Sequence, residues 1–228
     1  NTCIGCNQAC LDHVFSGKMT SCLVNPRACH ETELLIEPAS MLKNIAVVGA
    51  GPAGLAFATT AAERGHTVTL YDAADEIGGQ FNIAKQIPGK EEFFETLRYF
   101  GKRLENTGVQ VKLGASVGAQ DISAGGYDEV VLATGIEPRT PAIEGVDHPK
   151  VMSYLEVLRD KAPVGDKVAI IGAGGIGFDV AEYLTHDGES PAENLDLWKE
   201  EWGVGDPSEH RGGLAPEGAS PTASPRQV

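Results

Sequence analysis

Residues 45–72 read IAVVGAGPAGLAFATTAAERGHTVTLYD, and this segment carries the strongest fold signal in the chain. Four apolar residues at 45–48 have the pattern of a buried strand, and the glycine-rich turn GAGPAG follows at 49–54. An alanine-rich helix is then expected to about Arg64, with Gly65 as its C′ residue. A strand, a glycine turn and a helix in this order predict a Rossmann-like dinucleotide-binding unit.

Each glycine of this turn has a separate physical reason. Gly49 permits the tight turn, Gly51 lets the backbone approach a pyrophosphate, and Gly54 allows close packing of helix on strand. The start of the helix then offers unpaired N–H groups to the phosphates. The predicted pyrophosphate-binding residues are Gly49, Ala50, Gly51, Pro52, Ala53 and Gly54.

The segment after the helix predicts the ribose contact. Residues 67–71 alternate like a second strand, which Asp72 closes. A carboxylate at this position could accept hydrogen bonds from ribose hydroxyls. Farther on, we expect a helix over 91–106 and strands over 109–113 and 129–133.

Two short elements favour FAD over NAD at this first site. Gly78-Gly79-Gln80 follows Asp72 closely, and Val131-Leu132-Ala133-Thr134-Gly135 ends a later strand. Both resemble elements of flavoprotein reductases that bind two dinucleotides. The residues predicted to contact FAD here are Gly79, Gln80, Thr134 and Gly135.

The same pattern restarts about 120 residues later, which suggests two nucleotide domains rather than a short repeat. Residues 167–171 are expected to form a strand and 178–184 a helix, with the predicted pyrophosphate contacts Gly172, Gly174 and Gly177 between them. The cofactor would be NADP or NAD. The residue that selects between them is expected after a strand that begins near Gln227. The alternative is a retained fold that binds no nucleotide.

All five cysteines lie within the first 29 residues, which is typical of metal binding rather than a disulfide scaffold. Four have the spacing Cys3-x2-Cys6-x3-Cys10-x11-Cys22. Three thiolates close together and one apart favour a [4Fe–4S] cluster, and zinc or unligated thiols are the alternatives. Cys29 lies outside the pattern and is expected to be a small buried thiol.

Composition narrows the class of protein. A net charge of −14 argues against nucleic-acid binding. No apolar run of about 18 residues or secretion signal is found, so we expect no membrane partner and a cytoplasmic location. Because Asn1 is not a start methionine and 188–228 completes no fold, we expect a fragment of a longer protein.

With these motifs, the chain resembles the iron–sulfur flavoenzymes of the old yellow enzyme class, and among them the bacterial NADPH-dependent 2,4-dienoyl-CoA reductases. The resemblance spans nearly all of the chain, and the cysteine segment is its most specific part. It rests on NTCIGCNQ (1–8), TSCLVNP (20–26), EIGGQFNIA (76–84) and RTP (139–141).

The resemblance implies a barrel holding FMN and substrate upstream of this chain. NADPH would reduce FAD, and electrons would pass through the cluster to FMN, which reduces an unsaturated acyl-CoA of fatty acid β-oxidation. Cys3, Cys6, Cys10 and Cys22 match the cluster ligands, and Lys90 and Val117 fall where the family contacts FAD. The residues that protonate the substrate belong to the barrel, so no catalytic residue is assigned here.

The expected fold class is α/β in three parts. Residues 1–40 form the iron–sulfur segment, 41–149 an incomplete FAD-binding Rossmann-like domain, and 150–228 the start of a nested NAD(P)-binding domain with an insertion at 188–225. Three rivals remain. They are a reductase of another enone, a trimethylamine-dehydrogenase-like enzyme with outward electron flow, and a zinc-bound interaction module. The x3 spacing before Cys10 favours a reductase over the dehydrogenase.

Overall fold

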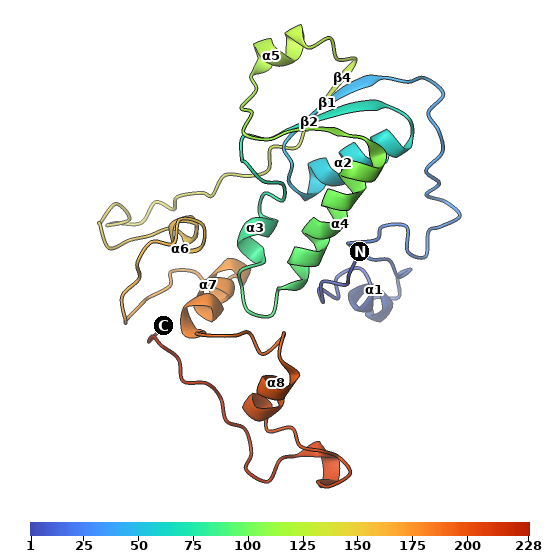
Figure 1. Ribbon diagram of the computed structural model, residues 1–228. Coiled ribbons are helices and arrows are strands. Elements are labelled where there is room, and N and C mark those ends of the chain that lie inside the picture. Colours follow the sequence, from blue (N-terminus) through green and yellow to red (C-terminus); the bar gives the residue numbers. More distant parts are fainter. The chain divides into compact units, whose positions relative to one another are not determined.

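The structure is a computed structural model that describes residues 1–228 (Figure 1). The chain divides into two compact units. Unit 1 comprises residues 1–82 and 92–139, and unit 2 comprises residues 83–91 and 140–228.

Unit 1 is built on a four-stranded parallel sheet in the order β3-β2-β1-β4. Its strands are β1 (Asn44–Val48), β2 (Thr67–Tyr71), β3 (Gln110–Lys112) and β4 (Glu129–Leu132). Val48 lies opposite both Tyr71 and Leu132, so the carboxyl ends of three strands meet at one edge. This sheet confirms the predicted α/β class and places the first glycine turn at the edge where such folds bind nucleotides.

Two helices, α2 (Pro52–Glu63) and α4 (Glu92–Thr107), pack together and against the sheet of unit 1 (Figure 1). The core between them is mainly apolar and contains Val47, Leu55 and Leu70, none of which is exposed. Two short helices, α1 (Leu11–Phe15) and α5 (Ala119–Ala124), complete this unit, and a third, α3 (Phe81–Ala84), begins in unit 1 and ends in unit 2. The predicted first strand–turn–helix–strand unit is confirmed, because each element has its expected bounds within two residues.

Unit 2 is smaller in its ordered core. It contains α6 (Tyr154–Leu158), α7 (Gly175–Thr185), α8 (Leu195–Trp202) and the short 3-10 helix η1 (Arg211–Gly213). A cluster of Ile87, Val157, Leu158, Val180 and Leu184 holds α6 and α7 together. Ser153 and Glu156 form a capping box at the start of α6, a signal that the periodicity analysis missed.

The predicted strand over 167–171 is wrong as a strand. The segment makes a single parallel bridge, from Lys167 to Gln227, and no ladder. A strand requires a neighbouring strand for its N–H and C=O groups, and this segment has one partner residue. The bridge does lie where the next strand was expected to begin.

The insertion predicted over 188–225 contains a helix that the sequence analysis did not predict, α8. Asn194 caps α8 by accepting hydrogen bonds from the N–H groups of Asp196 and Leu197, at 3.1 Å each. Gly203 ends the helix in the left-handed conformation, with φ at +66°. Asn before and Gly after an apolar periodic stretch is a recognisable helix signature.

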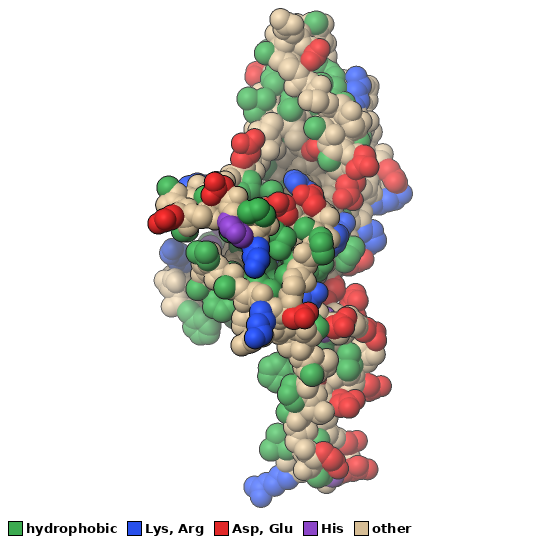
Figure 2. Space-filling view, turned by 90° about the vertical axis from the view of Figure 1, so that its left-hand side faces the viewer, with side chains coloured by type: hydrophobic (Ala, Val, Ile, Leu, Met, Phe, Trp, Pro, Cys, Tyr) green, Lys and Arg blue, Asp and Glu red, His purple; other side chains and the backbone are tan.

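Figure 2 shows many acidic side chains exposed at the surface, a large share of them along its right-hand edge. This distribution fits a solvated acidic surface for a chain of net charge −14. None of the helices combines the length and apolarity that crossing a lipid bilayer requires.

Candidate functional site

The first glycine turn has the shape that pyrophosphate binding requires. Gly49 has φ at +109°, and a Cβ on Gly54 would lie 1.8 Å from the carbonyl oxygen of Gly49, so neither position admits a side chain. Gly51 is the N-cap of α2, without a side-chain cap, and its own Cα hydrogens face open space. The first turn of α2 therefore offers uncapped N–H groups to an anion.

Two distant segments close around this turn. The N–H of Gly78 donates to the carbonyl oxygen of Ala50 at 2.8 Å, and a Cβ on Gly79 would lie 3.1 Å from Cα of Gly51. On the other side, a Cβ on Gly49 would meet the carbonyl oxygen of Ala133 at 2.2 Å and the nitrogen of Thr134 at 3.1 Å. The structure thus brings together the glycine turn and both elements predicted to contact FAD. Gln80, Thr134 and Gly135 are exposed at this edge.

Asp72 ties the turn to the end of β2. Its Oδ2 accepts a hydrogen bond from the Ala50 N–H at 2.5 Å, and its Oδ1 accepts one from the Ala74 N–H at 2.8 Å. An ionised carboxylate has about four lone-pair sites, so capacity remains for a ribose hydroxyl. The loop that carries the half-buried Val117 lies nearby, because the Ala115 N–H donates to the Asp72 carbonyl oxygen at 2.8 Å.

A tyrosine pair that the sequence analysis missed supports this end of β2. The hydroxyls of Tyr71 and Tyr127 are 2.6 Å apart, and Lys112 Nζ lies 3.3 Å from the Tyr71 hydroxyl. The hydrogen bond with Tyr127, assisted by Lys112, holds the pKa of Tyr71 below its ordinary value. Burial, with the hydrogen bond to Tyr71, raises the pKa of Tyr127. Sequence spacing could not find this pair, because 56 residues separate its members.

The second glycine turn repeats the local geometry in unit 2. Gly172 has φ at +120°, Gly174 is the uncapped N-cap of α7, and a Cβ on Gly177 would lie 2.1 Å from the Gly172 carbonyl oxygen. Lys90, predicted to contact FAD, forms an ion pair of 2.6 Å with Asp179 on α7. The positive φ of Gly172 and the uncapped N-terminus of α7 fit a second pyrophosphate at the start of this helix.

Two hydrogen bonds from backbone N–H groups shape the cysteine segment. The Ser21 N–H donates to the Ala9 carbonyl oxygen at 2.7 Å, which brings the residue before Cys22 next to the residue before Cys10. The Gly5 N–H donates to Cys3 Sγ at 3.3 Å, a contact suited to a thiolate. All cysteines are free thiols. The donor set fits an iron–sulfur cluster in chemistry, although no three Cys, His, Asp or Glu side chains converge as ligands of a single ion.

The expectation for Cys29 is wrong, because its thiol is exposed. Cys29 sits in a turn with φ at +62°, and its N–H donates to a carboxylate oxygen of Glu31 at 3.2 Å. A turn at the surface leaves the side chain no core to enter.

The chain is similar to known oxidoreductases. Residues 43–192 match the family described as pyridine nucleotide-disulphide oxidoreductase. The chain is 39% identical over 197 residues to a metal reductase of Desulforamulus reducens, covering 85% of this chain and 30% of that protein. It is 36% identical over 188 residues to a cinnamate reductase of Clostridium sporogenes, covering 82% and 28%.

A solved structure of 2-naphthoyl-CoA reductase with 2-naphthoyl-CoA matches 80% of this chain and 28% of its own, with 39% identity and a TM-score of 0.77. The chain thus spans less than a third of the length of these relatives. The family match covers both glycine turns, and it supports FAD and NAD(P) binding by an oxidoreductase domain. The chain belongs to the pyridine nucleotide-disulphide oxidoreductase family.

Proposed function

We propose that this chain is the electron-transfer part of an NAD(P)H-dependent flavoenzyme, which supplies electrons for reduction of a carbon–carbon double bond conjugated to a carbonyl. The main support is that unit 1 contains both the four-cysteine segment and the first glycine turn, which Gly79 and the segment Ala133–Thr134 contact. A chain with both a set of cluster-type cysteines and a flavin-type site is suited to passing electrons between a cluster and a flavin.

The residues of the two turns would hold the nucleotides. Around the first turn, uncapped N–H groups of α2 would bind the FAD pyrophosphate, and Asp72 would bind the ribose. The start of α7 would bind the NADP or NAD pyrophosphate. Bound FAD exchanges two electrons with a nicotinamide and single electrons with an iron–sulfur cluster, so it can join the two kinds of carrier.

Cys3, Cys6, Cys10 and Cys22 would hold the [4Fe–4S] cluster. The segment contributes the Gly5 N–H to Cys3, and the hydrogen bond from the Ser21 N–H to the Ala9 carbonyl oxygen joins the residue before Cys22 to the residue before Cys10. A backbone N–H that donates to a ligand sulfur stabilises its negative charge.

The substrate class rests on the relatives. One acts on cinnamate and another binds 2-naphthoyl-CoA, both of which are conjugated carbonyl compounds. Within this class we propose an unsaturated acyl-CoA, such as a 2,4-dienoyl-CoA, reduced at an FMN held outside this chain. The enzyme would be cytoplasmic.

The test uses the full-length protein and the substitution Cys10→Ser, with Cys29→Ser as its matched control. We expect Cys10→Ser to lose its iron while keeping FAD, and Cys29→Ser to keep both. Iron and flavin are quantified on the purified proteins. Normal iron in Cys10→Ser would show that the ligand assignment is wrong.

A second measurement tests the direction of electron flow. Anaerobic mixing of the wild-type enzyme with NADPH or NADH should bleach the flavin absorbance. If neither nicotinamide bleaches the flavin and a substrate amine does, the enzyme is a dehydrogenase with outward flow.

A further inference from the structure

Unit 1 contains a cavity of about 370 Å³ that the nucleotide sites do not use. Its walls are the loop 23–27, which follows Cys22, and one face each of α2 and α4. Of the residues predicted to hold FAD, only Pro52 lines it. The volume falls within the ~300–1,000 Å³ range of small-molecule sites.

Unsatisfied polar atoms concentrate in this cavity. Five buried side-chain polar atoms in the chain lack a hydrogen-bond partner, and three of them belong to lining residues: Arg27 Nε, Thr96 Oγ1 and Arg103 Nε. Thr96 is 1% exposed, so water outside the protein does not reach it. Nearly all buried polar groups in proteins are paired. Three unpaired polar atoms around one cavity therefore indicate a missing hydrogen-bond partner.

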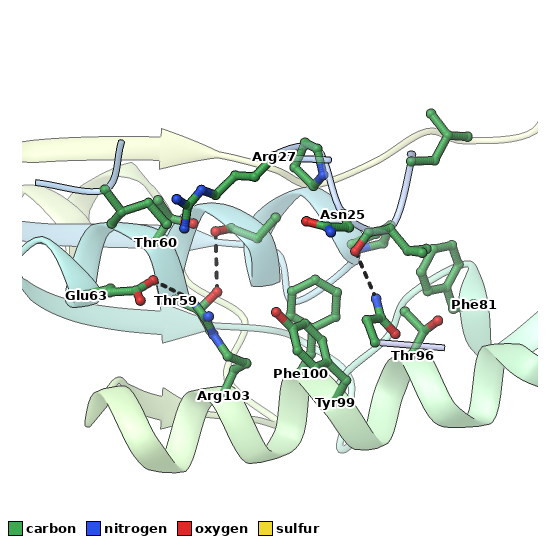
Figure 3. A pocket seen from close by; sticks show the side chains of 17 residues that line it. Asn25, Arg27, Thr59, Thr60, Glu63, Phe81, Thr96, Tyr99, Phe100 and Arg103 are labelled. Carbon is green, nitrogen blue, oxygen red and sulfur yellow. Dashed lines mark hydrogen bonds and ion pairs between the residues drawn. The ribbon is translucent and has the colours of Figure 1, made fainter. Parts of the chain in front are cut away.

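The charged side chains of the cavity indicate the sign of the charge on its ligand. Arg27 makes no ion pair and no side-chain hydrogen bond, whereas Arg103 pairs with Glu63 at 2.7 Å. Two guanidinium groups and one carboxylate give a net positive site in a chain of net charge −14. Figure 3 shows the guanidinium groups of Arg27 and Arg103 toward one end of the cavity. Guanidinium is the group best suited to binding a carboxylate through paired hydrogen bonds.

The other end is aromatic and apolar. Tyr99 and Phe100 rise from α4, and Phe81 lies beyond them near Thr96 (Figure 3). Apolar walls with a few convergent polar groups are typical of sites for small organic ligands.

We propose that this cavity binds a small organic anion. Its carboxylate lies between Arg27 and Arg103, and its aromatic or apolar body packs on Phe100 and Phe81. The proposal is independent of the electron-transfer function, since it uses neither glycine turn nor any cysteine.

The test titrates three probes into the full-length, FAD-loaded protein by calorimetry. Phenylacetate has the proposed charge and body, phenylacetamide has the body without the charge, and inorganic phosphate has charge without the body. We expect phenylacetate to saturate one site with a Kd of about 1 mM or below, and the other two to bind at least about tenfold more weakly.

Two substitutions locate the site. Arg27→Gln removes the unpaired charge and should weaken phenylacetate at least about tenfold. Arg98→Gln is the matched control, because Arg98 lies on α4 outside the cavity and pairs with Glu95. Ala56→Phe fills the cavity without changing its charge and should also abolish binding. This variant keeps the test decisive if Arg27→Gln folds poorly.

Three results would overturn the proposal. They are no saturable phenylacetate binding, equal binding of phenylacetamide or phosphate, and unchanged binding in both Arg27→Gln and Ala56→Phe.

Discussion

The two glycine turns have almost the same backbone and very different surroundings. Gly49 and Gly172 share a positive φ, and Gly54 and Gly177 both press against the carbonyl oxygen five residues earlier. The first turn is buried against the sheet, where Ala50 and Leu55 are 0% exposed. In the second, Ile176 and Phe178 are 53% and 68% exposed. The shape of a glycine turn is therefore encoded locally, whereas its burial depends on the neighbouring strands.

Substituting the first glycine of each turn is expected to give the largest difference in stability between the two turns. Gly49→Ala and Gly172→Ala both place an alanine at positive φ, which costs about 1–3 kcal/mol. At Gly49 the new Cβ would also lie 2.2 Å from the Ala133 carbonyl oxygen, whereas at Gly172 nothing lies within 4 Å. We expect Gly49→Ala to lower the free energy of unfolding by more than about 4 kcal/mol, and Gly172→Ala only by the strain.

Chemical unfolding of the two full-length variants measures this difference. Equal losses would mean that backbone strain alone governs both turns and that the packing of β4 on the first contributes nothing.

The two turns also differ in the carboxylate that contacts the first one from the end of β2. Asp72 accepts a hydrogen bond from the Ala50 N–H, whereas the equivalent amide of Ala173 has no partner. Asp72→Asn removes the charge that orders the turn and would bind the ribose, so we expect FAD affinity to fall about tenfold, or about 1.4 kcal/mol. Fluorescence titration of the FAD-free full-length protein measures it. Asp75→Asn, in the same loop, is the control, and an equal loss there would remove Asp72 from the site.

The smallest expected effect is on the titration of the tyrosine pair, Tyr71 and Tyr127. Tyr71 belongs to the sheet against which the first glycine turn packs. The lowered pKa of Tyr71 means that the unfolded chain binds its proton more tightly than the folded chain. The contribution of Tyr71 ionisation to the free energy of unfolding is therefore absent at neutral pH. It grows as the pH rises through the lowered pKa of the folded chain and is complete above 10.0, the ordinary pKa of the unfolded chain. Tyr127, whose pKa is raised, opposes this gain at higher pH.

Tyr127→Phe removes the largest cause of the Tyr71 shift. We expect the lowest phenol titration, followed by ultraviolet absorbance, to move to higher pH in this variant. A titration curve unchanged from wild type would show that the two hydroxyls do not interact in solution.

Sequence reasoning predicted the first unit well, because its signals are local. The bounds of β1, α2 and β2 followed from apolar periodicity, the turn GAGPAG and the helix-ending Gly65, whose φ is +97°. It failed at 167–171, where periodicity alone cannot supply a pairing strand. It also missed α8, although Asn194 and Gly203 mark both ends.

In the candidate site, too, some features follow from the sequence and others only from the tertiary structure. The spacing of the glycines, of Asp72 and of the four cysteines already predicts dinucleotide and metal chemistry.

Only the tertiary structure decides that Gly79 and Ala133 close on the first turn, that Cys29 is exposed, and that Arg27 and Arg103 face one cavity. The reason is the separation along the sequence over which each kind of interaction acts. Periodicity and turn preferences act over a few residues, whereas these contacts join segments about 25 to 85 residues apart and depend on how helices pack on the sheet.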